Sequence, residues 1–475
     1  MAELTAINPR TGKADYRFAA ASRAEIAAEA ARLRAAQGPW EALGSEGRAA
    51  VLRAWADVLE AEAGAIIAAL AQDTGRETIA GIEVNGMIAN IRRWAGRGPE
   101  LFAALDQGPR PSAVPGIEIR THHSAFPLFG AIAPWNFPVI LSHVDAVPAL
   151  MAGSAALVKP SEVTPRCVAP LRHCAAQVPE LPLAYVLGGP EVGAALVEEV
   201  DYICFTGSTA TGRKVAEAAA RRLIPANLEL GGKDPMIITA SADPHWAAQI
   251  ALRASVVATG QACQSIERVY VARAIAAPFL AALTEAARAV RPAYPPGAGG
   301  ALGPFIFPPQ ARKVAAQIDE ALAKGARVLT GGRIEELGGG LYLAPTVLVD
   351  VTPEMAVMRE ETFGPVIPVT IFDTIEEAIR LANASDYGLA GAVLAGSIDE
   401  AAAIAPLLDV GAVSIQDGAL TSIVGDAPNM SRKRSGLGPS RSGDAGMLRF
   451  LRQQALIVQK GTPLPLSAYA ERVAP

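Results

Sequence analysis

Phe129-Gly130-Ala131-Ile132-Ala133-Pro134-Trp135-Asn136-Phe137-Pro138 opens a regular alternation of strand and helix patterns. Its first half predicts a short apolar strand over 130–133, and Pro138 predicts the start of a helix to about 151. Further strands are predicted at 155–158, 183–187, 202–205 and 227–230, and helices at 165–177, 191–198 and 211–222. Short apolar strands separated by helices are typical of a parallel sheet covered on both faces. In such a sheet a nucleotide binds beyond the carboxyl ends of the strands.

A second alternation follows and predicts a second α/β domain. Its strands are predicted at 235–238, 268–271, 327–330, 345–349, 366–372, 391–394 and 411–415, and its helices at 242–257, 278–289, 310–324, 375–384 and 398–407.

The residues before the first alternation predict a short extended lead-in with a turn at 8–12, and then three helices. The helices are predicted at 22–37, 48–73 and 77–105, the first with a capping box formed by Ser22 and Glu25. Residues 117–121 alternate apolar and polar side chains, which predicts an exposed strand. Residues 452–460 predict a final strand that completes this ribbon, which is suited to pairing with another subunit.

The composition is that of a globular protein. Of 475 residues, 51% are hydrophobic and 19% charged, and the net charge is −5, which excludes a disordered chain and indicates no basic surface for nucleic acid. The four cysteines form no Cys-x-x-Cys and the five histidines no ligand spacing, so we expect reduced thiols, no metal and a cytoplasmic location. We find no signal-peptide pattern and no apolar run long enough for a membrane helix.

Glu229 and Cys263 bound the stretch that carries the most chemistry. Glu229 lies between two leucines ahead of Gly231-Gly232, and Cys263 follows Gly260-Gln261-Ala262. A turn at the Gly-Gln pair leaves backbone N–H groups near the thiol, which favours the thiolate nucleophile. A thiol and a carboxylate together indicate covalent catalysis followed by base-assisted hydrolysis. The alternatives are a solvated surface carboxylate and a small buried thiol.

Polar residues follow three of the predicted strands. Asn136 can donate to an oxyanion, or it can cap the next helix. Lys159 and Glu162 suit the two hydroxyls of a ribose, and the acidic residue favours NAD over NADP; the alternative is a surface turn. The turn at 205–212 offers helix N-terminal N–H groups to a pyrophosphate, although it lacks the usual glycine fingerprint.

Two later segments are less specific. Glu361 and Phe363 lie in Glu360-Glu361-Thr362-Phe363-Gly364-Pro365, where a carboxylate can hold a ribose while the ring packs near a planar cofactor. The alternative is a solvated pair of glutamates before a turn. The basic, glycine-rich residues 433–438 predict only a loop.

In this order, the motifs resemble those of the NAD(P)-dependent aldehyde dehydrogenase superfamily, from Asn8-Pro9 to the final strand. The most specific ones lie at 134–138, 228–233, 260–263 and 361–365. The resemblance implies an α/β fold with two parallel-sheet domains and a small bridging β-ribbon. It implies an NAD-binding domain at 1–107 and 126–231, a catalytic domain at 232–448, and an oligomerisation ribbon and tail at 108–125 and 449–475. Family members assemble as homodimers or homotetramers.

The resemblance also implies the roles of single residues. Cys263 corresponds to the nucleophile that attacks an aldehyde, and Asn136 with the Cys263 N–H to the oxyanion hole. Glu229 corresponds to the base that activates water to hydrolyse the thioester. The implied cofactor contacts are Trp135, Lys159, Glu162, Gly207, Ser208, Leu230, Gly231, Glu361 and Phe363.

Two segments depart from many family members. Pro428-Asn429-Met430-Ser431 replaces Pro-Phe-Gly-Gly, and Gln416-Asp417 stands where an Asn is common. Both lie where the family builds its substrate entrance, so they leave the identity of the aldehyde open. The apolar residues 139–141 with Val144 favour a hydrophobic or aromatic aldehyde over an acidic semialdehyde.

Two other functions compete with hydrolytic aldehyde oxidation. One is coenzyme A acylation, whose enzymes often lack the carboxylate that Glu229 supplies. The other is an inactive scaffold of the same fold, against which Cys263, Glu229 and Asn136 argue.

Overall fold

The first sheet of the computed structural model, which describes residues 3–471, has six strands in the order β21-β9-β8-β5-β6-β7. They are β5 (Leu128–Ile132), β6 (Ala155–Lys159), β7 (Leu183–Tyr185), β8 (Tyr202–Thr206), β9 (Ala226–Glu229) and β21 (Gly436–Leu437). The first five are parallel, as predicted, and are almost entirely buried because helices cover both faces. Only the two-residue β21 is antiparallel to its neighbour.

Five helices connect these strands. They are α5 (Pro138–His143), α6 (Ala146–Ala152), α7 (Val168–Ala176), α8 (Pro190–Glu199) and α9 (Thr209–Arg221). The single helix predicted at 138–151 is wrong, since α5 and α6 are separate. The break lies at Val144 and Asp145, and Pro148 has no N–H to donate to the carbonyl of Val144 and so continue one helix across it.

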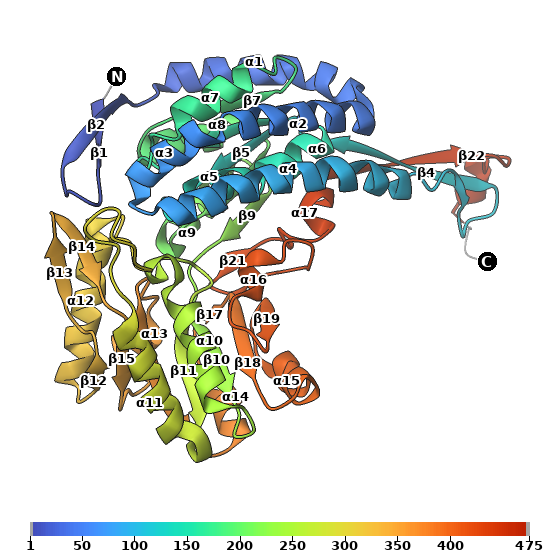
Figure 1. Cartoon of the computed structure of the whole chain (residues 1–475). Helices are drawn as coiled ribbons and strands as arrows, with labels where there is room; N and C mark the ends of the chain where they lie inside the picture. The colour runs from blue at the N-terminus through green and yellow to red at the C-terminus, as the bar shows by residue number, and fades with distance from the viewer. Residues whose placement is uncertain (1–2, 472–475) are drawn as a thin grey trace.

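Four helices precede the sheet and lie along it (Figure 1). They are α1 (Arg23–Ala42), α2 (Gly44–Ala61), α3 (Ala63–Thr74) and α4 (Glu77–Leu105). The capping box of Ser22 and Glu25 is confirmed. The predicted helix at 48–73 is two helices, because Glu62 leaves helical geometry (φ −98°, ψ 6°) and α3 packs against α4 as a separate helix. The strands β1 (Glu3–Ile7) and β2 (Ala14–Ala19) form a hairpin around the predicted turn.

The second sheet has seven strands in the order β12-β15-β16-β11-β10-β18-β19. They are β10 (Asp234–Ile238), β11 (Ile266–Ala272), β12 (Arg327–Thr330), β15 (Thr346–Val349), β16 (Val366–Phe372), β18 (Ala390–Leu394) and β19 (Ala412–Ile415). All pairs are parallel except β12 with β15 at the edge. The predicted second α/β domain is thus confirmed. Its helices are α10 (Pro244–Val256), α11 (Arg273–Ala289), α12 (Pro308–Ala323), α14 (Ile375–Asn383) and α15 (Ile398–Ile404).

Several short elements have no counterpart in the sequence prediction. They are β13 (Ile334–Leu337), β14 (Gly340–Leu343), β17 (Tyr387–Gly388), β20 (Arg432–Lys433), α13 (Ala356–Arg359), α16 (Leu420–Ile423), α17 (Ala445–Leu448), and the 3-10 turns η1 (Val257–Gly260) and η3 (Leu466–Tyr469). The 3-10 turn η2 (Ala405–Leu407) directly follows α15 and is the last part of the helix predicted at 398–407. The hairpin of β13 and β14 turns at Gly338 and Gly339, both left-handed. The strand β13 is half-exposed, with two glutamates at its centre, and β14 is mostly buried but only four residues long, so neither gives the sequence the apolar run of a core strand.

The predicted ribbon is confirmed as a three-stranded sheet that projects from the body (Figure 1). The strand β4 (Ile117–Ala125) pairs with the short β3 (Arg110–Pro111) and, antiparallel over its whole length, with β22 (Leu451–Gln459). Leu456 and Ile457 on β22 are exposed. The predicted tail extends to 475, and residues 472–475 lie outside the described part of the chain.

Candidate active site

The two sheets face each other through their connecting loops. The loops that follow β5 and β9 of the first sheet contact those that precede β11 and β16 of the second. Parallel strands bring their carboxyl ends to one edge, so residues far apart in sequence meet there. All the sequence-predicted site residues lie on these loops or on the neighbouring ends of β6, β8 and β9.

Cys263 lies on a tightly bent loop between η1 and β11. Ala258, Thr259 and Gly260 are all left-handed, with φ of 56°, 62° and 65°. A Cβ on Gly260 would lie 2.4 Å from the carbonyl of Gly364, so only glycine fits there. Three consecutive residues in this sparsely populated region are a feature of functional loops, where surrounding contacts hold the strain.

Gln261 holds this loop against its surroundings. Its buried side-chain amide accepts from the N–H of Ile306 at 2.9 Å and donates to the carbonyls of Pro304, at 3.3 Å, and Ala258, at 3.4 Å. Cys263, two residues on, is half-buried. The backbone around the thiol is therefore rigid before any ligand binds.

Asn136 follows β5 and reaches across to the Cys263 loop. Its Nδ2 donates to the backbone carbonyl of Gln261 at 3.1 Å. Arg76 on α4 donates to the carbonyls of Asn136 and of Ala258, the latter at 3.2 Å. The residue that caps α5 is Phe137, without a side-chain bond, so the helix-capping alternative for Asn136 is wrong. An amide held beside the thiol loop is what an oxyanion donor requires.

Glu229 is the last residue of β9, and its carboxylate is buried. Neither oxygen accepts a hydrogen bond, and Nη1 of Arg441 lies 3.7 Å from Oε2. Burial raises the pKa of Glu229, while the charge of Arg441 and the Cys263 thiol act in the opposite direction. A buried carboxyl group whose pKa is raised is suited to act as a general base.

The ionisation of the Cys263 thiol differs from what its Gly-Gln turn led us to expect. Burial raises its pKa well above the usual value, and the neighbouring charge of Glu229 adds to this. The expected easy ionisation is therefore wrong for the chain without ligands. Desolvation and a like charge outweigh nearby backbone N–H groups, so the thiol keeps its proton until a base removes it.

Lys159 and Glu162 form an ion pair at the end of β6. Nζ of Lys159 lies 3.0 Å from Oε2 of Glu162 and also donates to the carbonyl of Pro160 at 3.3 Å. Lys159 is buried, whereas the Glu162 side chain is 37% exposed. The carboxylate is thus held in place and remains open to a ligand.

Gly207 and Ser208 form the turn between β8 and α9. The N–H of Gly207 donates to the backbone carbonyl of Glu229 at 3.1 Å. The Ser208 hydroxyl caps α9 and accepts from the N–H of Thr211 at 3.3 Å. The turn therefore fixes the start of α9, and the Gly207 N–H is already paired.

Glu361 and Phe363 come from the loop before β16. The Glu361 carboxylate accepts from the N–H of Gly232 at 3.2 Å, and a Cβ on Gly231 would lie 2.9 Å from its Oε2. Burial, and next the charge of Glu267, raise the pKa of Glu361 to about 7. The ring of Phe363 meets that of Trp135 edge-on, with 5.4 Å between centroids.

Leu230 completes the contact between the two sheets. Its side chain is buried and its N–H donates to the carbonyl of Ser435 at 2.8 Å. The loop predicted at 433–438 is thus the wall beside Glu229, through the pairing of β21 with β9.

Four supporting side chains escaped the sequence analysis. Glu83 accepts from the N–H of Val139 at 2.7 Å and of Ile140 at 3.1 Å, which anchors α5. Glu267 accepts from the N–H of Phe363 at 2.7 Å. The other two are Arg76, which donates to the carbonyls of Asn136 and Ala258, and Arg441, which lies beside Glu229. They lie outside any motif, and only the fold brings them to the site.

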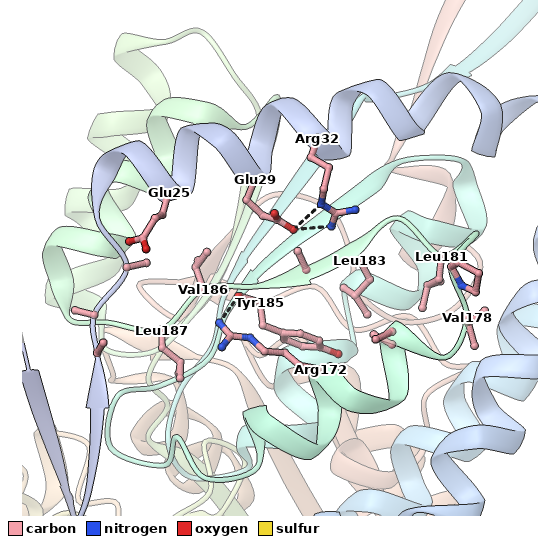
Figure 2. A pocket seen from close by; sticks show the side chains of 17 residues that line it. Glu25, Glu29, Arg32, Arg172, Val178, Leu181, Leu183, Tyr185, Val186 and Leu187 are labelled. Carbon is pink, nitrogen blue, oxygen red and sulfur yellow. Dashed lines mark hydrogen bonds and ion pairs between the residues drawn. The ribbon is translucent and has the colours of Figure 1, made fainter. Parts of the chain in front are cut away.

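A separate pocket lies away from these residues. It has a volume of about 570 Å³ and lies between α1 and the β7 edge, as Figure 2 shows, with Glu25, Glu29, Arg172 and Leu187 among its lining residues. Arg172 donates to the carbonyl of Tyr185 there at 2.6 Å. None of the predicted site residues lines it.

Within residues 3–471 there is no group of three or more His, Cys, Asp or Glu side chains that could hold a metal ion. The same residues contain no helix whose length and apolar character would let it cross a membrane.

Comparison with known proteins gives consistent matches. The model of the aldehyde dehydrogenase family matches residues 2–456. The Mycolicibacterium smegmatis protein named "Putative succinate-semialdehyde dehydrogenase", with NADP(+) in its name, is 39% identical over 92% of this chain and 85% of its own length.

Two solved structures share the whole fold. The structure described as "Putative Aldehyde Dehydrogenase PutA" from Anabaena variabilis has a TM-score of 0.94 and 45% identity, covering 98% of this chain and 99% of its own. Lactaldehyde dehydrogenase from Escherichia coli has a TM-score of 0.91 and 32% identity, covering 97% and 96%.

Proposed function

This chain belongs to the aldehyde dehydrogenase family and is an oxidoreductase that acts on aldehydes, and we propose that it oxidises a hydrophobic or aromatic aldehyde to its acid with NAD. Cys263 is the nucleophile, Glu229 the base, and Asn136 with the Cys263 N–H the oxyanion hole. The observation that carries this proposal is the meeting of the Glu229 carboxylate, the Cys263 thiol and the Asn136 amide at one junction.

The reaction follows from these positions. The Cys263 thiol gives its proton to solvent water, and the sulfur attacks the aldehyde carbon, whose oxygen is held by Asn136. When bound, the dinucleotide supplies the acceptor for the hydride that leaves this carbon. A thioester remains on Cys263. Glu229 then takes a proton from water, which attacks the thioester; the C–S bond breaks, the sulfur receives that proton from Glu229, and the acid and the thiol are released.

The residues after the strand ends fit a dinucleotide. The Glu162 carboxylate, held by Lys159, can accept from ribose hydroxyls, and Glu361 can accept from a second ribose. The rings of Trp135 and Phe363 can pack against the planar rings of the dinucleotide. At Gly207, Ser208, Leu230 and Gly231 the backbone can approach the dinucleotide closely. The carboxylate of Glu162 repels a 2′-phosphate, which supports NAD over NADP. The NADP(+) in the name of the 39% identical relative argues for the opposite preference.

The substrate preference rests on the wall formed by α5 and the residue after it. Val139, Ile140, Leu141 and Val144 are apolar, and an acidic aldehyde gains no ion pair from them. The relative's name points to succinate semialdehyde instead. Comparable kcat/KM values for succinic semialdehyde and for benzaldehyde or a medium-chain aldehyde would contradict the apolar preference.

The domain roles follow from the same arrangement. Residues 1–107 and 126–231 form the NAD-binding domain, 232–448 the catalytic domain, and 108–125 with 449–475 the oligomerisation ribbon and tail. The exposed apolar residues of β22 support assembly as a homodimer or homotetramer. The four free cysteines suit a cytoplasmic location.

One experiment separates this function from its two alternatives. Reduced dinucleotide is followed by absorbance with a panel of aliphatic, aromatic and acidic aldehydes, with wild type and Cys263→Ala, and with NAD or NADP. Turnover that requires Cys263 and prefers NAD supports the proposal. Turnover only with added coenzyme A indicates an acylating enzyme, and absence of both turnover and dinucleotide binding indicates a scaffold.

A further inference from the structure

A buried cluster of three charged groups lies behind Glu229. Asp145, between α5 and α6, pairs with Nη2 of Arg441 at 2.5 Å and also with Arg449. Nη2 of Arg441 donates to Thr206 Oγ1 as well, at 2.8 Å. The guanidinium is therefore fixed on one side, and its free side lies toward Glu229, with Nη1 3.7 Å from Oε2.

A small cavity adjoins this contact. It holds about 20 Å³ and is lined by Glu229, Arg441, Gln264 and neighbours from β9 and β21. A volume above roughly 10–15 Å³ accommodates one water molecule. Both oxygens of Glu229 and Oε1 of Gln264 are buried acceptors without a protein donor. The contact of 3.7 Å is longer than a direct hydrogen bond, so a water in the cavity could donate to Glu229 or Gln264 beside it.

Among the groups whose charge acts on Glu229, Arg441 is the positively charged one. The groups whose charge acts on Glu229 are Cys263, Asp145, Asp234, Glu361 and Arg441. The acidic groups and the thiol oppose ionisation of Glu229 when they are charged. Among residues 3–471, Arg441 is the one basic side chain with a nitrogen within 4.0 Å of this carboxylate.

We propose that Arg441, held by Asp145, is a positioning residue that orients the Glu229 carboxylate and keeps it ionised for thioester hydrolysis. The inference rests on the proposed function of Glu229. It assigns Arg441 to the second half of the reaction: the transfer of hydride from the aldehyde does not need it, whereas the attack of water on the Cys263 thioester does. Without the cation, Glu229 stays protonated to higher pH and cannot take the proton of water.

The test compares Arg441→Met and Arg441→Lys with wild type in rapid-mixing experiments. For Arg441→Met we expect a burst of reduced dinucleotide equal to the active-site concentration, followed by a steady rate about 10-fold below wild type. The midpoint of the pH dependence of the steady rate moves upward by about one unit. Arg441→Lys should recover part of the steady rate and reduce the shift of the pH midpoint, because it retains the positive charge.

A chemical control isolates the hydrolytic step. Hydroxylamine attacks the Cys263 thioester, breaks the C–S bond and forms a hydroxamate without needing an activated water, so it should restore the steady rate of Arg441→Met. Asp145→Asn, which frees Arg441, should give a weaker form of the same defect if Arg441→Met does not fold. Arg432→Met, an exposed arginine that pairs with Asp409 away from Glu229, is the matched control and should leave both phases unchanged.

Three outcomes overturn the proposal. They are an unchanged pH midpoint in Arg441→Met, the loss of its burst together with its steady rate, and a failure of hydroxylamine to accelerate turnover. A wild type that oxidises no aldehyde at all overturns the proposed function instead, so the two failures are distinguishable.

Discussion

The side-chain amide of Asn136 donates a hydrogen bond of 3.1 Å to the backbone carbonyl of Gln261. This contact joins the end of the first sheet to the loop that carries Cys263, two residues further on. Gln261 itself is fully buried, so the geometry is set on both sides. The donor of the oxyanion hole and the nucleophile are thus held by one rigid junction.

Replacing Asn136 tests this junction. Asn136→Ala removes the proposed oxyanion donor, and we expect kcat to fall by about 10²–10³, with the KM for the dinucleotide nearly unchanged. The lost hydrogen bond lowers the free energy of unfolding by only about 1 kcal/mol. Steady-state kinetics and thermal unfolding measure both. Asn8→Ala, in the N-terminal hairpin, is the control, and a kcat within twofold of wild type for Asn136→Ala would remove Asn136 from the mechanism.

Replacing the base separates the two halves of the reaction. In Glu229→Gln we expect one turnover of reduced dinucleotide per active site and then a steady rate at least about 10²-fold below wild type, because the thioester is no longer hydrolysed. Mass spectrometry of the quenched protein should detect the acyl group on Cys263. The exposed Glu198→Gln is the control. Wild-type hydrolysis by Glu229→Gln would assign the base elsewhere.

Glu162 tests the dinucleotide preference. Glu162→Thr removes the carboxylate that opposes a 2′-phosphate, so we expect the ratio of kcat/KM for NAD to that for NADP to fall by about 10-fold, or about 1.4 kcal/mol. The exposed Glu180→Gln, at the opposite edge of the same sheet before β7, should leave the ratio unchanged. A wild type that already prefers NADP would show that Glu162 does not decide the choice.

The pKa of Glu83 predicts how stability depends on pH. Burial raises it to about 7 from an ordinary value of 4.5. Between these values the folded chain binds more protons than the unfolded chain, so the free energy of unfolding falls as pH rises through this window. Glu83→Gln removes this component and keeps an oxygen that accepts from Val139 and Ile140. Between pH 5 and about 7, we expect the unfolding temperature of Glu83→Gln to decline less than that of wild type. The control Glu77→Gln, on the same helix, should decline as wild type does. Parallel declines in Glu83→Gln and wild type would show that Glu83 is ionised throughout this range.

The ribbon tests assembly. Ile457 is 70% exposed on β22, and Ile457→Asp places a charge on the surface proposed to meet another subunit. We expect the mass in light scattering to fall to that of a single chain. Leu223→Asp, at an even more exposed position on the body, should keep the wild-type mass. An unchanged mass for Ile457→Asp would place the subunit contact away from β22.

Sequence patterns predicted the regular elements well where the physical signal is local. The strands β6, β8 and β16 are short and wholly apolar or nearly so, and they were found within a residue or two of their ends. Breaks inside helices were missed, as at Glu62, because a break that redirects a helix depends on what it packs against. The hairpin of β13 and β14 was missed for a different reason: each strand has four residues, and together they contain no apolar run.

By itself the sequence determined which residues can react and which family the chain resembles, because motifs such as those at 134–138 and 260–263 are contiguous. Only the tertiary structure decided their chemical state. Burial and the approach of Glu229 hold the Cys263 thiol protonated, and Asp145 brings Arg441 to Glu229 from a segment more than two hundred residues away. Desolvation and charge act through space, so a pattern along the chain cannot report them.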